Sequence, residues 1–259
     1  MPVAAKVFLS GAYKTATGMM HDSLRFKGLI PAAQPYASMG YTGTETVANS
    51  VLTVTGANAI VDWVLVELRS DTATVAIRKA ALVQRDGDIV ETDGVTPVSL
   101  SGAAGNYYVV VKHRNHLGVM TANKIALTST ATTIDFTNPL TTNFQRFGAV
   151  GSSYAQRTMG SVRALWGGNA GGGTTIKGTG ASSDTESVLF KVLLDAGNTT
   201  ISPSYMIYNV YVREDANMDG KLIYQGTGAE VDDILFNVLL HGGNANVVPT
   251  FIINEQIPN

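Results

Sequence analysis

The sequence predicts a mainly β protein, in which an antiparallel β-sandwich is followed by a small α-helical module of two loop-helix repeats. The first part of the chain consists of short apolar runs separated by turn residues, a pattern typical of antiparallel sheets. The last part repeats itself at a spacing of 46 residues. Apolar residues make up 45% of the chain and charged residues 15%, which favours a folded protein over a disordered one.

The chain divides into three expected segments. We predict a β-sandwich over residues 1–138, a linker over 139–160 and tandem repeats over 161–259. The linker is marked by Pro139 and by the Gly-Ser-Ser cluster at 151–153, because these residue types favour turns and surface connections.

The strands of the first segment follow from their apolar patterns. Residues 60–68 carry apolar side chains on both faces, apart from Asp62, and predict a central strand covered on two sides. Residues 75–84 and 88–91 are joined by Arg85-Asp86-Gly87, whose Asp-Gly pair suits a tight hairpin. Two further strands are predicted over residues 107–113 and 124–127. Strands at this spacing are typical of an immunoglobulin-like sandwich.

Each of the two repeats, 161–209 and 210–259, contains one amphipathic helix. Phe190 is equivalent to Phe236, and Pro203 is equivalent to Pro249. Apolar residues recur at helical spacing in both: Val188, Leu189, Val192 and Leu193, then Ile234, Leu235, Val238 and Leu239. Neither helix is long enough to be stable alone in water, so we expect the two apolar stripes to pack on each other or on the sandwich.

The second repeat contains the first half of an EF-hand-type calcium loop. Asp215, Asn217 and Asp219 stand at positions 1, 3 and 5 of this loop, where oxygen-bearing side chains converge on the ion. Gly220 at position 6 permits the sharp turn, and Lys221 at position 7 offers its backbone carbonyl. The alternative is a polar turn without a metal, for which Asp, Asn and Gly are also favoured.

The residue that closes the calcium shell is less clear from the spacing. Position 12, where a carboxylate is usual, is Gly226, and the preceding residues suggest a small inserted turn. We expect Asp232 to supply the last ligand, with Glu230 and Asp233 as alternatives at the start of the same helix. The first repeat has Asn169, Gly171 and Gly173 at positions 1, 3 and 5, with Asp184 and Glu186 as the nearby carboxylates, so ion binding there is the weaker hypothesis.

The residue types present favour a protein that is not an enzyme. The chain has no cysteine, and no serine lies in a Gly-x-Ser-x-Gly turn. The Gly-rich stretch 167–173 lacks the Lys-Ser/Thr of a phosphate loop. His113 and His116 follow a strand and enter a turn, so their rings need not converge, while His21 and His241 are isolated. Trp63 and Trp166 lie in apolar runs and are expected in the core.

Charge and hydropathy restrict the partners. The net charge is −2, and no cluster of Lys and Arg is dense enough to follow a phosphate backbone, which argues against nucleic acid. Apolar runs are soon interrupted by charges, so we expect no membrane insertion. The first ten residues lack the pattern of a signal peptide and read as a strand, so no leader is expected in this numbering.

Long stretches of the chain resemble the C-terminal hemagglutinin-like or adhesin-like regions of large secreted surface proteins of Bacteroidetes. The similar stretches span nearly the whole chain and include residues 61–69, 82–90, 108–120, 164–170 and 215–220. The second half also resembles dockerins, whose paired loop-helix repeats hold Ca²⁺, although the lengthened loop and the altered first repeat depart from that pattern. The resemblance implies export and an extracellular or cell-surface location.

The leading hypothesis is a non-enzymatic surface or fibre module in which structural Ca²⁺ stabilises the repeats. Its expected partners are other surface proteins or copies of itself, with glycans as a further class. The alternative is a carbohydrate-binding module, because tyrosines on an exposed face of a sandwich could stack on sugar rings. The candidate tyrosines are Tyr13, Tyr36, Tyr41 and Tyr154.

Overall fold

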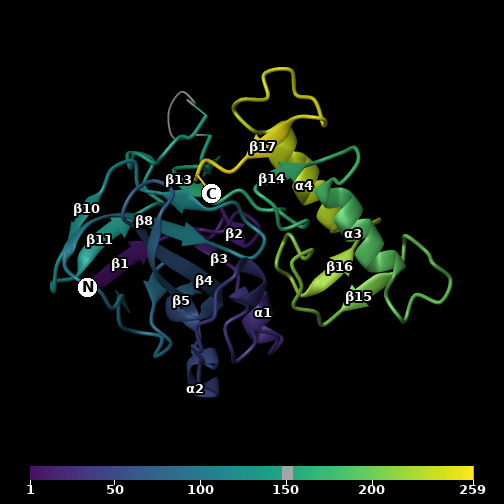
Figure 1. Cartoon of the computed structure of the whole chain (residues 1–259). Helices are drawn as coiled ribbons and strands as arrows, with labels where there is room; N and C mark the ends of the chain where they lie inside the picture. Colours follow the sequence, from purple (N-terminus) through teal and green to yellow (C-terminus); the bar gives the residue numbers. More distant parts are fainter. Residues whose placement is uncertain (148–153, 259) are drawn as a thin grey trace.

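The computed structural model of the protein describes residues 1–147 and 154–258. The fold is mainly β, with 31% of residues in strands and 14% in helices. The predicted linker falls partly outside the described residues, since 148–153 are not among them, and its last residues form the strand β12 (Arg157–Met159), which pairs with β13 (Val162–Ala164). Figure 1 shows the sheets of the first part on one side of the molecule and the two long helices on the other.

The largest sheet has six antiparallel strands and is built around β4 (Ile60–Arg69). β4 pairs with β5 (Val75–Gln84) on one side and with β8 (Gly105–Lys112) on the other. The sheet is completed by β6 (Ile89–Val90), β9 (Val119–Met120) and β10 (Ile125–Leu127). Every residue of β4 is buried, which confirms a central strand covered on both faces, and the β5–β6 hairpin is also confirmed.

A second sheet places β1 (Pro2–Lys6) between two partners. β1 runs parallel to β11 (Thr132–Asp135) and antiparallel to β7 (Val98–Ser99). Val3 of β1 and Ile134 of β11 belong to the same hydrophobic core as Trp63 of β4, so the two sheets share one interior. We call residues 1–147 the sheet region.

The sheet region also contains several short elements that the apolar patterns did not predict. They are the hairpin β2 (Tyr13–Lys14) and β3 (Met19–Met20), the helices α1 (Ser23–Phe26) and α2 (Asn49–Leu52), and the 3-10 turns η1 (Tyr36–Met39) and η2 (Gly56–Asn58). Each has four residues or fewer, too few to show a periodic apolar face.

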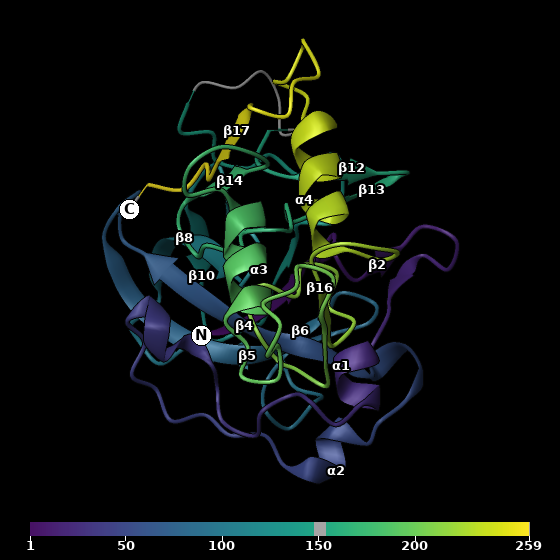
Figure 2. The ribbon, with the colours of Figure 1, turned by 90° about the vertical axis from the view of Figure 1, so that its right-hand side faces the viewer.

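The two repeats lie within residues 161–258, which we call the repeat region. The helices are α3 (Asp184–Leu193) and α4 (Glu230–Leu239), and they contact each other, as one of the two predicted packings requires. Figure 2 shows them side by side in front of the sheets. Val188 and Val192 of α3 share one core with Ile234 and Val238 of α4.

The strands of the repeat region are exchanged between the repeats. β14 (Thr175–Lys177), which precedes α3, pairs with β17 (Ile252–Asn254), which follows α4. β16 (Lys221–Ile223), which precedes α4, pairs with β15 (Met206–Tyr208), which follows α3. Each repeat therefore completes the sheet of the other.

Direct backbone bonds join the two regions. The Leu165 N–H donates to Phe8, the Ser10 N–H donates to Leu165, and the Leu117 N–H donates to Trp166. Trp63 and Trp166 are both buried, as expected. In the part of the chain that the structure describes, no helix is long and apolar enough to cross a membrane.

Candidate metal centre

The loop between β15 and β16 folds its carboxylates inward. Asp215 is fully buried, and its two carboxylate oxygens accept the N–H groups of Asp219 at 3.1 Å and Gly220 at 2.8 Å. Asn217 Oδ1 accepts the same Asp219 N–H at 2.9 Å. Gly220 has φ of +76°, a left-handed conformation that glycine adopts without strain. These contacts turn the loop around the side chains of Asp215 and Asn217.

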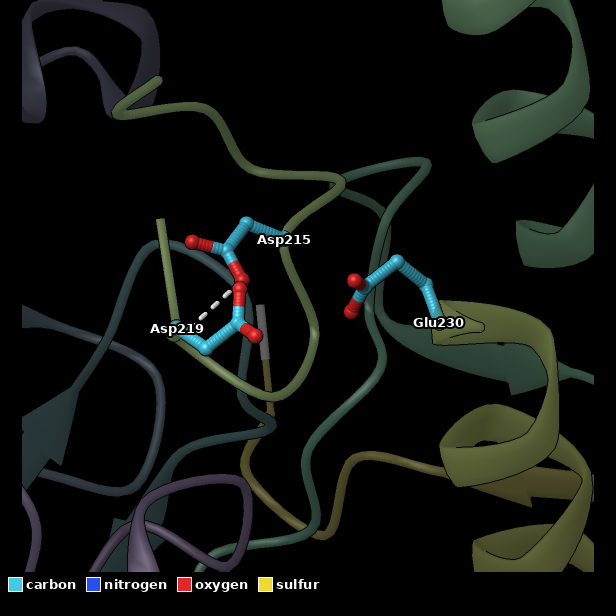
Figure 3. A group of neighbouring side chains, drawn as sticks. All are labelled: Asp215, Asp219 and Glu230. Carbon is cyan, nitrogen blue, oxygen red and sulfur yellow. Dashed lines mark hydrogen bonds between the residues drawn. The ribbon is translucent and has the colours of Figure 1, made fainter. Parts of the chain in front are cut away.

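Glu230 reaches this loop from the first residue of α4. Its Oε2 accepts the N–H groups of Ala216 at 2.8 Å and Asn217 at 3.1 Å, and its Oε1 faces Asn217 Nδ2 at 3.3 Å. All three groups are N–H donors, which suit the ionised carboxylate. Figure 3 shows Glu230 pointing from the helix toward Asp215 and Asp219.

The three carboxylates have a spacing that suits one divalent cation. One oxygen each from Asp215, Asp219 and Glu230 lie within 4.8 Å of one another. Calcium binds oxygens at about 2.4 Å, so two ligands on opposite sides of the ion are about 4.8 Å apart. The three oxygens can therefore all reach a single ion.

The electrostatics of the group favour a bound cation. Burial raises the pKa of Glu230 to about 10, and the neighbouring Asp215 carboxylate contributes to the shift. Burial also raises the pKa of Asp215 to about 7, against the opposing effect of Arg114. A buried anion is stable only when it is paired or coordinates a metal, so two carboxylates this close need a positive charge to remain ionised.

The sheet region holds the outer side of the same loop. Three backbone carbonyls of the loop accept hydrogen bonds from it: that of Asp215 from Asn115 Nδ2 at 2.6 Å, that of Asn217 from His21 Nε2 at 3.1 Å, and that of Asp219 from Lys27 Nζ. His21 donates through Nε2 because its Nδ1 accepts the Ser23 backbone N–H at 3.4 Å.

Two further residues fit the loop tightly against the sheets. The Met218 side chain is buried in the core of the sheet region, and this packing holds Met218 in a left-handed conformation with φ of +61°. A β-carbon on Gly11 would lie 2.1 Å from the carbonyl oxygen of Ala216. The loop is thus enclosed by α4 on one side and by the sheet region on the other.

No known family, curated protein or solved structure matches this chain. The function must therefore be argued from the geometry of the chain itself.

The structure places the other predicted ligands as follows. Asp232 is exposed, outside the group formed by Asp215, Asp219 and Glu230, so the carboxylate that the sequence favoured is replaced by Glu230. Asp233 is half-buried, and burial raises its pKa, but it also lies outside the group. Lys221 is at the start of β16, directly after the loop.

Glu230 could have been found from the repeats. It is 46 residues after Asp184, and both begin a helix. The two residues are therefore equivalent, and both side chains return to the loop of their own repeat.

The first repeat uses its carboxylate differently. Asp184 accepts the N–H groups of Gly171 at 2.8 Å and Lys177 at 2.7 Å, so both of its oxygens are bonded to backbone. Gly171 and Gly173 bring no side-chain oxygen, and Glu186 is not grouped with Asp184 as a possible metal site in the described part of the chain. In the first repeat, Asp184 alone is bonded to backbone amides at the position where the second repeat has its group of three carboxylates.

A buried polar network joins the sheet region to the repeats beside the metal centre. Asp62 accepts hydrogen bonds from Tyr211 at 2.6 Å and from Arg114 Nε at 3.0 Å, and it faces His113 Nε2 at 3.2 Å. Burial alone would raise the pKa of Asp62, but Arg114 and His113 outweigh it and lower the pKa to about 2. Asp62, a charged residue within the apolar run 60–68, is therefore the anchor of this network.

The two adjacent histidines converge, contrary to the expectation from their turn. His113 Nδ1 and His116 Nδ1 are 3.0 Å apart, and His116 Nε2 accepts the Gly11 N–H at 3.2 Å. His116 must then carry its proton on Nδ1 and His113 on Nε2, where it donates to Asp62. Both rings are buried and neutral, with pKa values lowered by burial, and both have a structural role.

The tyrosines proposed as sugar platforms do not form one. Tyr36 and Tyr13 are buried in the core of the sheet region, and the Tyr36 hydroxyl donates to the Trp63 carbonyl at 2.7 Å. Tyr41 donates to Glu45, while Tyr154 packs against His241 in the repeat region. The four side chains share no exposed face.

Proposed function

We propose that the chain is a non-enzymatic structural module in which one Ca²⁺ fixes the second repeat to the sheet region. The ligands are Asp215, Asn217, Asp219 and Glu230, with the backbone carbonyl of Lys221. The proposal includes the finer description of the fold, a β-sandwich joined to a dockerin-like pair of repeats. The observation that carries it is that one carboxylate oxygen each from the buried Asp215 and Glu230 and the half-buried Asp219 lie within 4.8 Å of one another.

The donor set favours calcium over other ions. Every proposed ligand is an oxygen, which argues against the nitrogen and sulfur sites typical of zinc. Magnesium keeps several waters and prefers a strict octahedron, whereas a loop with five protein oxygens suits the larger calcium shell. Water is expected to complete the coordination.

The ion acts at the junction of the two regions. The loop that would hold it is bonded through three carbonyls to Asn115, His21 and Lys27, so ordering the loop also orders its contacts with the sheet region. Calcium that binds only the folded state adds its binding free energy to stability.

The resemblance to secreted surface proteins supplies the proposed setting, the outside of a bacterial cell. Calcium modules in that setting bind with dissociation constants of about 10⁻⁴ to 10⁻³ M, which extracellular calcium can fill. A role in adhesion or assembly is supported by large apolar side chains exposed at equivalent positions of both repeats, Phe190 with Phe236 and Leu194 with Leu240. Sedimentation over a wide range of protein concentrations separates self-assembly, in which the particle grows, from a module that binds other proteins.

Calorimetric melting of the full chain tests the calcium proposal. At a calcium concentration about 100 times the Kd, we expect Tm to rise by about 5–10 °C over the value in chelator. The double variant Asp215→Ala with Asp219→Ala should lose this rise. Asp93→Ala is the matched control, because Asp93 is a carboxylate of a separate surface turn, bonded to Val95 N–H. Equal melting of the parent chain with calcium and with chelator would contradict the proposal.

A further inference from the structure

A cavity of about 260 Å³ lies where the sheet region meets both repeats. Its wall includes Lys112 and Arg114 at the end of β8, Asn169 in the loop of the first repeat, Arg213 and Glu255. Junctions of this kind are common places for small-ligand sites. The volume suits a ligand no larger than a monosaccharide.

The cavity wall has more positive than negative charge. Lys112 Nζ is 3.7 Å from a Glu255 carboxylate oxygen, so these two charges offset each other. Arg213 donates to the Gly171 carbonyl at 3.1 Å and, among the described residues, has no carboxylate within ion-pairing distance. Arg114 shares Asp62 with His113 and Tyr211. The Arg213 charge is left for a ligand.

Two of the residues that line the cavity each carry a buried polar atom that has no partner in the described chain. Arg114 donates through Nε to Asp62 and through Nη1 to the Val212 carbonyl, but its Nη2 has no acceptor. Asn169 donates through Nδ2 to the Gly173 carbonyl at 2.7 Å, which fixes the orientation of the amide, and its Oδ1 has no donor. Leaving such groups unpaired is unfavourable, and more so for the charged one.

We propose that this cavity binds a small oxyanion that also carries a hydroxyl group, such as hydrogen phosphate or a sugar acid. The anionic oxygens accept from Arg114 Nη2 and Arg213, and the hydroxyl donates to Asn169 Oδ1. His113 and His116 also line the cavity, but both rings are bonded within the buried network and take no part. The site uses none of the proposed calcium ligands.

Titration calorimetry on the full chain tests the proposal, with free divalent cations removed so that phosphate remains soluble. The four probes are inorganic phosphate, galacturonate, sulfate, which has no hydroxyl at neutral pH, and galactose, which has no charge. We expect phosphate or galacturonate to bind at least tenfold more tightly than sulfate or galactose, since one charge-assisted hydrogen bond contributes roughly this factor. Whichever of the first two binds more tightly identifies the source of the oxyanion.

Variants separate this site from general attraction of anions. Arg213→Gln should weaken binding roughly tenfold, whereas Lys124→Gln, the same charge change on an exposed residue outside the cavity wall, should not. Asn169→Ala should remove the preference for phosphate over sulfate. Binding should persist in Asp219→Asn, where the calcium site is impaired. No heat from phosphate or galacturonate at millimolar concentration, equal affinity for all four probes, or no effect of Arg213→Gln would each overturn the proposal.

Discussion

Glu230 determines the charge balance of the metal centre. Its three hydrogen bonds all come from N–H donors, and burial together with Asp215 raises its pKa to about 10. Without a cation, the protein must either protonate this residue or tolerate a buried, unpaired charge, and both lower its stability. Glu230 therefore lowers the stability of the ion-free protein, whereas in the proposed calcium-bound state it is a ligand.

Replacing Glu230 by Gln should therefore have opposite effects in the two states. With chelator, Glu230→Gln should raise the free energy of unfolding by about 1 kcal/mol or more, because the variant no longer has to protonate a buried carboxylate or bury its charge. Calcium should raise the free energy of unfolding of the variant much less than that of the parent, since one proposed carboxylate ligand is lost. Asp232→Asn is the matched control and should resemble the parent in both. Calcium-dependent melting of all three proteins provides the measurement, and a variant that keeps the full calcium gain would exclude Glu230 as a ligand.

The close contact of Gly11 with the loop between β15 and β16 can be tested by substitution. A β-carbon there meets the Ala216 carbonyl at 2.1 Å, so Gly11→Ala must displace the loop. We expect a loss of about 1–3 kcal/mol in the free energy of unfolding, as for other overpacked sites. Gly173→Ala, with nothing within 4 Å of its added carbon, should change little in a urea denaturation experiment. Equal stability of the two variants would argue against a close seam.

The sequence identified part of the site because part of it is local. Asp215, Asn217 and Asp219 are two residues apart, and this spacing alone brings their side chains to one centre. Glu230 was ranked below Asp232 because the inserted turn shifts the closing carboxylate from position 12 to position 16 of the loop. Asp62 and His113 could not be paired from the sequence, because their contact joins different strands of the sheet.

At the scale of elements, the best-predicted features are those with a strong period. The apolar stripes located α3 and α4, and the two-sided apolar run located β4. The exchange of strands between the repeats was not predicted, because three-residue strands such as β14 and β17 carry no signal of their partner. Partner choice there depends on the packing of the helices.

The segments that follow both helices are fixed by equivalent asparagines. Asn198 Nδ2 donates to the carbonyls of Val192 and Ser202, and Asn244 Nδ2 donates in the same way to Val238 and Val248. Asn244→Ala should lower the free energy of unfolding by about 1–3 kcal/mol, because buried carbonyls lose their donor. Asn246→Ala, on an exposed neighbour, should have little effect on the same chemical denaturation curve. Indistinguishable curves would mean that water replaces the amide.

For the whole molecule, calcium and pH should act together. The raised pKa values of Asp215 and Glu230 mean that the ion-free native state binds more protons than the unfolded state above about pH 4. Its stability should therefore fall as pH rises. His113 and His116 act in the opposite direction, because their lowered pKa values favour the native state as pH rises toward about 6.5, above which their contribution is constant.

Between about pH 7 and pH 9 the change in stability reports on Asp215 and Glu230 alone, because His113 and His116 no longer titrate there. In chelator, Tm should decrease across this range, mainly through Glu230. With saturating calcium the decrease should vanish, because the ion keeps both carboxylates ionised, so the stabilisation by calcium grows with pH. A chelated protein whose Tm is constant over this range would show that Glu230 is not buried as a neutral acid.

The exchanged pairing of β14 with β17 and of β15 with β16 also bears on how this half of the chain could have arisen. A polypeptide carrying one loop-helix unit alone would expose two unsatisfied edges. Two such polypeptides could close each other's edges around a twofold axis, giving a homodimer with the same contacts. Gene duplication and fusion would turn that dimer into the present chain, whose two copies could then diverge, so that only the second carries the proposed calcium ligands.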